Sequence, residues 1–146
     1  MEIERKFLVK TTPDNLTSYP CRFLEQGYLS TEPVVRVRQD NDKYELTYKS
    51  KGLMVREEYN LPLTKESYEH LKAKADGRII TKKRYMIPFA SYIIELDVFE
   101  GELAPLILAE VEFPSEEEAN AFVPPEWFGE DVTYSTKYHN SNLSKG

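Results

Sequence analysis

The chain begins Met1-Glu2-Ile3-Glu4-Arg5-Lys6, and the interpretation of the whole sequence starts from this stretch. In an extended strand the side chains alternate between two faces, so Glu2, Glu4 and Lys6 share one face and the odd-numbered residues share the other. Two acids and one base therefore stand in a single row.

Comparable charged rows recur in six more segments along the chain, which are Arg36/Arg38, Glu45/Lys49, Arg56/Glu58, Lys82/Arg84, Glu95/Asp97 and Glu110/Glu112. Any one row has a simple explanation, because a half-buried strand normally turns its polar side to water. A strand face in contact with water would be expected to contain uncharged polar residues (Ser, Thr, Asn and Gln) among the charged ones. These rows, however, are almost wholly ionic. Acidic and basic pairs are also separated by strand, which predicts that the rows face one another around an anion and its metal counter-ions.

Composition limits the classes of function. At 146 residues the chain is expected to form a single domain, 1–146, and its net charge of −6 with a pI near 5.1 argues against binding to nucleic acid or to acidic membranes. The single Cys21 cannot form an internal disulfide and is expected to be a buried thiol. No segment is long and apolar enough to span a membrane, and the first charged strand leaves no room for a leader peptide, so we expect a cytoplasmic protein.

Alternation and turn residues predict eight strands, over residues 2–9, 22–30, 34–39, 43–50, 54–61, 79–88, 91–99 and 106–113. Two helices are expected between and after them. Thr64 is a candidate N-cap for a helix to about Ala75, and Ser115 with Glu118 is typical of a capping box that opens a helix to about Val123. The residues after Pro124-Pro125 are expected to be short turns and an irregular tail.

A sheet with charges along one face either leaves that face in water or closes around it. An eight-stranded barrel has an interior wide enough for side chains or for one small ligand. We therefore predict an α+β, mainly β fold: a closed eight-stranded antiparallel barrel with a charged lumen and helices packed outside. The outward apolar residues, such as Ile3, Phe7 and Val111, would be covered by those helices and by aromatic side chains of the loops.

A charged lumen needs a functional reason, because buried charges are costly unless they are paired or bind an ion. Carboxylates such as Glu2, Glu4, Glu110 and Glu112 are hard oxygen donors, which suits Mg²⁺ or Mn²⁺ better than zinc. Arginine's planar fork matches phosphate oxygens in pairs. Together the two sets of residues predict a site for a metal-chelated oligophosphate.

The sequence also resembles a known family. Glu2-Ile3-Glu4-Arg5-Lys6 is similar to the ExExK signature of the CYTH superfamily, the triphosphate tunnel metalloenzymes. Further motifs resemble the family's strands in order, namely Val35-Arg36-Val37-Arg38, Leu46-Thr47-Tyr48-Lys49, Lys82-Lys83-Arg84-Tyr85, Glu95-Leu96-Asp97 and Ala109-Glu110-Val111-Glu112. The resemblance covers the chain from end to end. It implies a closed tunnel, a divalent cation and a triphosphate-containing substrate.

The resemblance also implies roles for individual residues. The expected metal ligands are Glu2, Glu4, Glu110, Glu112 and Asp97. The expected phosphate-binding residues are Lys6, Arg36, Arg38, Lys49, Arg56, Lys82 and Arg84. Tyr28 and Lys49 fall where some hydrolytic members have a pair that prepares the attacking water, and Lys6 joins them as an expected catalytic residue. The alternative for Tyr28 is an ordinary strand aromatic with its hydroxyl at the surface, and His70 and His139 are expected to be solvated.

These expectations predict metal-dependent hydrolysis of inorganic triphosphate (tripolyphosphate) to pyrophosphate and phosphate. Three alternatives stay open: a thiamine triphosphatase, a class IV adenylate cyclase, and a polyphosphate- or nucleotide-binding module without hydrolysis. The expected partner is a small triphosphate molecule, not nucleic acid or a membrane, and the protein is expected to be a monomer or a homodimer.

Overall fold

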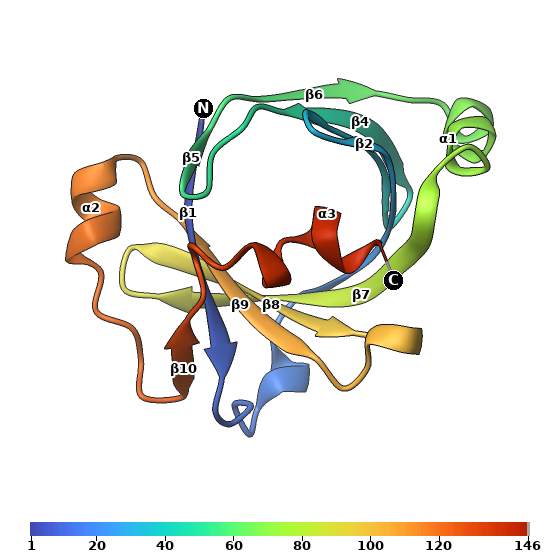
Figure 1. Cartoon of the computed structure of the whole chain (residues 1–146). Helices are drawn as coiled ribbons and strands as arrows, with labels where there is room; N and C mark the ends of the chain where they lie inside the picture. The colour runs from blue at the N-terminus through green and yellow to red at the C-terminus, as the bar shows by residue number, and fades with distance from the viewer. Residues whose placement is uncertain (146) are drawn as a thin grey trace.

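Ten strands form one antiparallel sheet that curls around a central channel in the computed structural model, which describes residues 1–145 (Figure 1). The strands are β1 Glu2–Val9, β2 Cys21–Thr31, β3 Val34–Asp40, β4 Lys43–Lys49, β5 Val55–Arg56, β6 Glu58–Pro62, β7 Asp76–Phe89, β8 Tyr92–Phe99, β9 Ile107–Glu112 and β10 Phe128–Asp131. The helices are α1 Lys65–Lys72, α2 Glu116–Ala121 and α3 Asn140–Leu143, with 3-10 turns at η1 Leu16–Ser18, η2 Gly101–Leu103 and η3 Thr136–Tyr138. Gly146, the last residue of the expected domain, lies outside the described residues.

The barrel closes through the segment that contains β5 and β6. Neighbouring strands follow the order β1-β9-β8-β7-β2-β3-β4-β6, and β5, which is separated from β6 only by Glu57, pairs with β1 at Ile3 and Val55. Residues 55–62 therefore act as one bent eighth strand that contacts β4 with one half and β1 with the other. The predicted eight-stranded antiparallel barrel is confirmed, although the expected strand 54–61 is broken in two.

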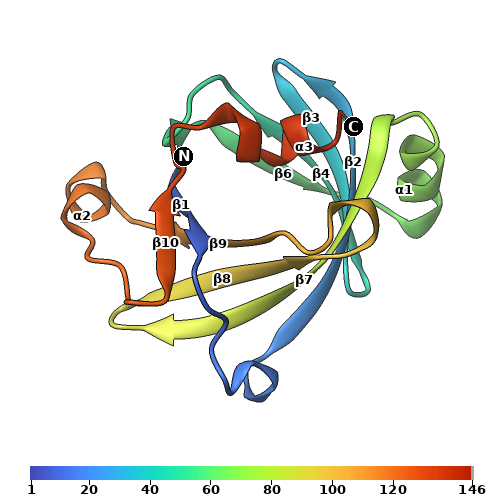
Figure 2. The ribbon, with the colours of Figure 1, turned by 60° about the horizontal axis from the view of Figure 1, so that its bottom comes forward.

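The end of the chain was predicted wrongly. It is not an irregular tail, because it holds β10, η3 and α3. β10 pairs with β1 on the outside of the barrel, and α3 lies across the open end of the channel in Figures 1 and 2. Tertiary hydrogen bonds fix this segment, such as the 2.8 Å bond from the Val132 amide to the Lys6 carbonyl, and these leave no periodic pattern in the sequence.

One of the two apolar clusters lies outside the barrel wall, as the alternation predicted. The second, which includes Tyr28, Val34, Ile80 and Leu108, lies on the strand faces that also carry the charged rows. The outward residues Ile3, Phe7, Leu96 and Val111 are buried in one cluster that β10 and α2 help to cover. The rings of Phe7 and Phe128 pack with their centroids 4.8 Å apart. Because the cluster around Phe7 packs against the outer faces of the strands, the charged residues on their inner faces are left to line the channel.

Helix α1 starts where its capping residue predicts. The Thr64 hydroxyl accepts a hydrogen bond from the Ser67 amide at 3.0 Å, and the Thr64 amide donates to the Ser67 hydroxyl at 3.0 Å. Tyr68 of α1 is fully buried and donates to the Glu25 carboxylate of β2 at 2.8 Å, which fixes the helix on the outer wall. The helix ends before the expected Ala75, because β7 starts early, at Asp76.

Helix α2 also has the expected cap, since the Ser115 hydroxyl accepts from the Glu118 amide at 3.1 Å. The prediction for Cys21 is wrong: it is exposed, because it is the first residue of β2 and lies at the rim of the sheet. Among the helices of residues 1–145, none has both the length and the apolarity that crossing a bilayer requires.

Candidate functional site

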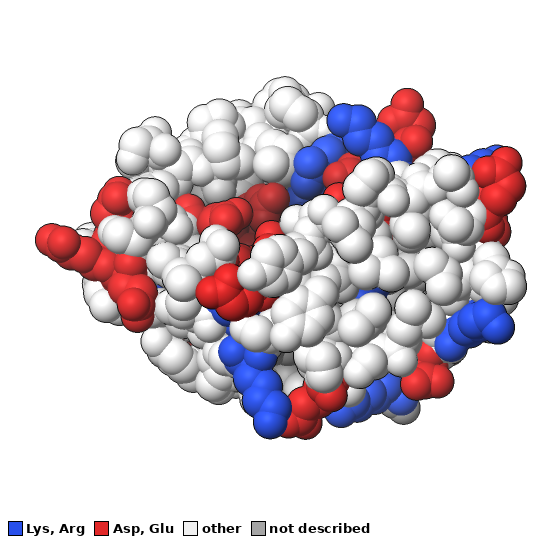
Figure 3. All heavy atoms as spheres, turned by 90° about the horizontal axis from the view of Figure 1, so that it is seen from above, with Lys and Arg blue, Asp and Glu red and all other residues white. Residues whose placement is uncertain are grey.

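The channel contains a cavity of about 310 Å³ whose wall is almost entirely polar. Eight acids and seven bases line it, drawn from β1 to β9. The residues that line it are Glu2, Glu4, Lys6, Arg22, Tyr28, Val34, Arg36, Arg38, Asp40, Glu45, Lys49, Arg56, Glu58, Asn60, Arg84, Glu95, Glu110, Glu112, His139, Asn140 and Ser141. Figure 3 shows acidic side chains sunk in a hollow of the surface with basic ones beside them.

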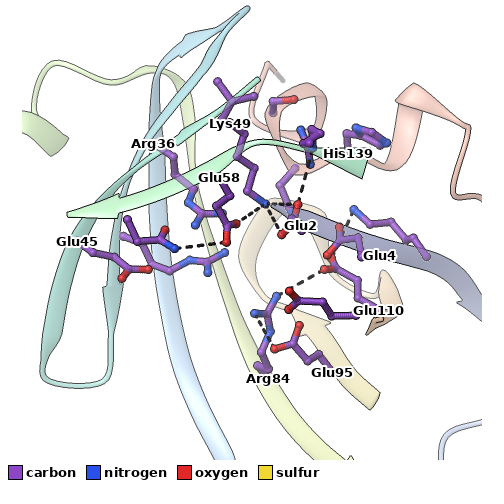
Figure 4. A pocket seen from close by; sticks show the side chains of 18 of the residues that line it. Glu2, Glu4, Arg36, Glu45, Lys49, Glu58, Arg84, Glu95, Glu110 and His139 are labelled. Carbon is purple, nitrogen blue, oxygen red and sulfur yellow. Dashed lines mark hydrogen bonds and ion pairs between the residues drawn. The ribbon is translucent and has the colours of Figure 1, made fainter. Parts of the chain in front are cut away.

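The carboxylates gather on the wall formed by β1, β9 and β8. Register explains why: Glu4 stands opposite Glu112 and Lys6 opposite Glu110, while Glu110 also faces Glu95 of β8. Figure 4 shows the side chains of Glu4, Glu95 and Glu110 pointing to the same part of the cavity. The expected metal ligands Glu2, Glu4, Glu110 and Glu112 are thus brought together on one wall.

Two of these carboxylates differ sharply in their electrostatics. Burial, together with the charges of Glu110 and Glu2, raises the pKa of Glu4 well above its ordinary value. Burial would also raise the pKa of Glu110, but Lys6 and Arg84 outweigh it and hold that pKa well below the usual range. The surroundings therefore disfavour the charged form of Glu4 and favour that of Glu110.

The acids fit a hard divalent cation that is completed by other ligands. One Glu110 oxygen, Oε1, is buried without a hydrogen-bond partner within residues 1–145, and its nearest cation is Lys6 at 3.4 Å. In the same residues, no three acidic, His or Cys side chains already converge as a ready-made metal cage. Mg²⁺ usually takes one or two carboxylates together with water and substrate phosphates, which this arrangement suits.

The opposite wall carries arginines that have only neutral partners. The guanidinium of Arg38 donates two hydrogen bonds to the Gln26 side-chain oxygen, at 2.9 and 2.7 Å, and Arg36 donates to the Thr47 hydroxyl at 3.1 Å. Burial and the neighbouring Arg36 and Arg84 lower the pKa of Arg38 to about 9. Within residues 1–145, neither of these buried guanidinium groups therefore makes a direct ion pair with a carboxylate.

Arg84 is held differently, in a network with Asp97 and Lys82. Its guanidinium binds the Asp97 carboxylate through two hydrogen bonds of 2.8 and 2.9 Å, and the Lys82 ammonium lies 2.7 Å from the same carboxylate. Lys82 and Asp97 are fully buried and lie behind the cavity wall, not on it. Both Asp97 oxygens are occupied by these cations, whereas the other four expected metal ligands face the cavity.

Lys49 and Arg56 stand near the amino end of β1. The Lys49 ammonium binds both oxygens of Glu2, at 3.1 and 3.0 Å, and lies 3.4 Å from Glu58. The Nε atom of Arg56 lies 3.8 Å from Glu2. Both bases line the cavity, so six of the seven expected phosphate-binding residues do so, and Lys82 is the exception.

Tyr28 faces the cavity, so it is not the ordinary strand aromatic with its hydroxyl at the outer surface. It is almost fully buried, and its hydroxyl accepts a hydrogen bond of 3.0 Å from the Gln26 amide. Burial alone would lower the pKa of Lys6, but the charges of Glu110 and Glu4 outweigh it and raise that pKa. Tyr28 and Lys49 thus share one cavity, although the Lys49 ammonium is bound to Glu2.

The carboxyl-terminal segment completes one end of the channel. The Lys6 ammonium donates to the Tyr138 carbonyl at 3.0 Å, and the Lys82 ammonium donates to the Asn140 side-chain oxygen at 3.3 Å. His139 is buried and lines the cavity, with Nε2 3.4 Å from the Thr133 carbonyl oxygen, so the expectation of a solvated His139 is wrong. His70 is exposed, as predicted.

Sequence reasoning missed some residues that line the cavity. Arg22, like its strand neighbour Gln26, shares the inward face of β2 with Tyr28, so alternation alone was enough to find it. Asp40 lies at the end of β3 on the same face as Arg38 and follows the same rule. His139 has no such signal, because it lies between two short helices.

Comparison with known proteins identifies several similar chains. The family model described as the CYTH domain matches residues 1–145. A protein of Nitrosomonas europaea named inorganic triphosphatase is 46% identical over 149 residues, which cover 98% of this chain and 96% of the relative. Another with the same name, from Acetivibrio thermocellus, is 39% identical over 150 residues, covering 99% and 93%.

Solved structures agree with this similarity. The crystal structure of the inorganic triphosphatase NE1496 matches with a TM-score of 0.74 and 42% identity, covering 100% of this chain and 95% of the other. The Hippeastrum protein HpAC1, whose description joins adenylyl cyclase with a dominant triphosphatase activity, has a TM-score of 0.64 at 17% identity over 83% of each chain. At that identity the second match supports only the fold.

Proposed function

The chain belongs to the CYTH domain family, and from this premise we propose that it is an inorganic triphosphatase, a hydrolase that cleaves tripolyphosphate to pyrophosphate and phosphate inside its channel. The relatives named inorganic triphosphatase, at 46% and 39% identity over nearly the full chain, support this substrate.

One observation carries the proposal: uncompensated charges of both signs face the same cavity. Arg36 and Arg38 are buried against neutral partners, while Glu4 is a half-buried carboxylate crowded by Glu2 and Glu110. A purely structural site would pair these groups with one another. A polyphosphate bound with a divalent cation satisfies both sets, because the anion neutralises the arginines and the cation relieves the acids.

The proposed roles follow from these positions. Glu2, Glu4, Glu110 and Glu112 hold Mg²⁺ or Mn²⁺, which when bound neutralises phosphate charge and polarises the phosphoryl oxygens. Lys6, Arg36, Arg38, Lys49, Arg56 and Arg84 bind the phosphate chain. Asp97 and Lys82 act from behind the wall as positioning residues, because together they hold Arg84 in its orientation.

Hydrolysis in this channel depends mainly on holding the phosphate chain in position and on stabilising its negative charge. Arg36 and Arg38 offer fixed N–H donors to the chain and lose no existing ion pair when they bind it. Tyr28 accepts a hydrogen bond from Gln26, so its own O–H is available to orient an oxygen atom in the cavity. Lys6 and Lys49 supply positive charge beside it, and the pyrophosphate leaving group departs along the arginine wall.

Purified protein incubated with tripolyphosphate and Mg²⁺ or Mn²⁺ tests this function, with phosphate release measured over time. Glu4→Gln is the control, because it keeps the size of the side chain and removes the charge that the proposal assigns to the metal. We expect release by the wild type and a loss of at least about 100-fold in the variant. Equal rates in both proteins, or no release by either, would reject the proposal.

The same assay separates the alternatives. Thiamine triphosphate tests for a thiamine triphosphatase, cyclic AMP formation from ATP tests for a cyclase, and metal-dependent binding without turnover identifies a binding module. The cytoplasmic location and the choice between monomer and homodimer remain predictions.

A further inference from the structure

Arg22 lies near the start of β2, beyond the end of β3, because Arg38 pairs with Gln26 and Asp40 with Leu24 in the β2–β3 register. It lies on β2 directly opposite Arg84 in the β2–β7 register, and it lines the cavity. Figure 4 shows Arg84 and Glu95 on the opposite side of this cavity from His139. Arg22 is therefore the last base on this wall before the channel opens.

Its guanidinium is held loosely between two carboxylates. Nη1 lies 3.4 Å from Asp40 of β3 and Nη2 lies 3.9 Å from Glu95 of β8. Both distances exceed the usual N–H···O hydrogen-bond range, whereas Arg84 binds Asp97 at 2.8 and 2.9 Å. The Arg22 Nε is buried and has no hydrogen-bond partner in the part of the chain that the structure describes.

A guanidinium with five donors and no short hydrogen bond readily exchanges partners. A phosphate group offers a forked set of oxygens that matches it in pairs, and the bond is charge-assisted. A polyphosphate held by Arg36 and Arg38 meets Arg22 as the next base toward this opening. The carboxylates of Asp40, Glu45 and Glu95, which line the same end, would repel phosphate groups that extended beyond it.

We propose that Arg22 binds the terminal phosphate group of the chain, and that Arg22 with its flanking carboxylates sets the length of polyphosphate that the channel accepts. Asp40 and Glu95 position the guanidinium while the channel lacks substrate and release it to phosphate oxygens on binding. No bond is made or broken in this exchange. The proposal rests on the proposed triphosphatase function and deepens it.

The test compares steady-state kinetics of the wild type, Arg22→Gln and Arg22→Lys on tripolyphosphate and on linear tetrapolyphosphate. For Arg22→Gln we expect KM for tripolyphosphate to rise about 10-fold or more, because one charged contact is lost, with a smaller change in kcat. The KM of Arg22→Lys for tripolyphosphate should lie between those of the wild type and Arg22→Gln, because lysine keeps the positive charge but lacks the paired donors of a guanidinium. Asp40→Asn should raise kcat/KM for tetrapolyphosphate relative to tripolyphosphate, because it removes part of the repulsion.

Lys83→Gln is the matched control. Lys83 neighbours Arg84 in sequence, but its side chain is half exposed and only reaches Glu100 at 4.0 Å, so the variant changes the net charge equally without touching the cavity. It should keep the wild-type KM on both substrates.

Several results would overturn the assignment. An unchanged KM and chain-length profile in Arg22→Gln, or a fall in kcat alone, would contradict a terminal phosphate contact. Calorimetric binding of tripolyphosphate without divalent metal provides a second readout, in which Arg22→Gln should bind more weakly than Lys83→Gln. If the wild type itself does not hydrolyse tripolyphosphate, the proposed function fails, whereas a wild type that is active beside an unchanged Arg22→Gln refutes only the role of Arg22.

Discussion

Arg38 illustrates how single residues of this channel serve binding at the expense of stability. Its charge is buried, its hydrogen bonds go to Gln26, and the nearby charges of Arg36 and Arg84 repel it. Because its pKa is lowered to about 9, the charged form that is present at pH 7 destabilises the folded protein relative to the unfolded chain. The proposed function accounts for this cost, because a bound phosphate chain would neutralise the Arg38 charge.

Arg38→Gln should therefore separate stability from function. We expect the free energy of unfolding at pH 7 to rise by roughly 1–2 kcal/mol, since the repelled charge is removed while a donor for Gln26 is kept. The KM for tripolyphosphate should rise at least about 10-fold. Urea unfolding and steady-state kinetics measure the two effects, and a variant that is both less stable and unchanged in KM would contradict this interpretation.

His139, in the carboxyl-terminal segment, makes the free energy of unfolding depend on pH. Burial first, and then the charge of Lys6, lower its pKa to about 4, with Arg56 adding to the effect while Glu110 and the Thr133 carbonyl oppose it. Between about pH 4 and the unfolded value of about 6.5, the unfolded chain binds more protons at this site than the folded one. Stability from this residue is therefore present above pH 6.5 and is lost as the pH falls toward 4.

His139→Gln should remove this part of the pH dependence. Between pH 7 and pH 5 the wild type should lose on the order of 1–2 kcal/mol more unfolding free energy than the variant. Urea titrations at the two pH values measure the difference. Parallel losses in both proteins would show that His139 does not carry the effect.

At the scale of elements, barrel closure depends on the turn before β5. Gly52 has a φ of +136°, and a Cβ atom there would collide with the Val55 carbonyl. This turn brings Met54 and β5 to β1, where the Glu4 amide donates to the Met54 carbonyl at 3.1 Å. The strand that carries Glu2 and Glu4 is thus fixed by a loop far from it in the sequence.

Gly52→Ala should destabilise the protein by about 2–3 kcal/mol, because backbone strain and a steric collision add. Gly101→Ala is the matched control, since Gly101 also has a positive φ, +66°, but a Cβ there meets no atom within 4 Å. Gly101→Ala should lose only about 1 kcal/mol. Thermal or urea unfolding measures the loss of stability in each variant. Equal losses would contradict the inference that the Gly52 turn closes the barrel.

The elements also explain what the sequence predicted and what it missed. Strand alternation was sufficient to assign the charged rows to one face and the apolar core to the other, since both properties repeat every two residues. It did not find the break at Glu57, where the Glu57 amide and carbonyl bond to Ser50. It also missed the structure of residues 128–143, because hydrogen bonds from Lys6, Lys82 and Arg78 to that segment are tertiary. Asp97 follows the alternation of its strand, but its burial behind Arg84 depends on the shape of the channel.

For the whole molecule, charge is distributed unevenly. The chain carries a net charge of −6, yet the cavity holds seven bases beside eight acids. The protein is thus acidic overall, while part of its interior is suited to an anion. An acidic outer surface around a cavity with arginines on one wall favours a small chelated anion over a long polyanion that would have to lie along the surface.

Ligand binding should stabilise the whole molecule. At a tripolyphosphate concentration about 100 times Kd, with Mg²⁺ present, the stabilisation of about 2.7 kcal/mol should raise Tm by roughly 5–10 °C. Sodium sulfate at the same ionic strength is the control, and Arg38→Gln should show a smaller shift. Equal shifts with both salts would indicate a general salt effect in place of a specific site.

The most direct measurement is anomalous diffraction from crystals soaked with tripolyphosphate and Mn²⁺. If the carboxylate and arginine walls together form one site, a manganese peak will lie inside the channel beside Glu4 and Glu110, with phosphate density along Arg36 and Arg38. Manganese and phosphate found only on the outer surface, with the channel holding water alone, would contradict the account.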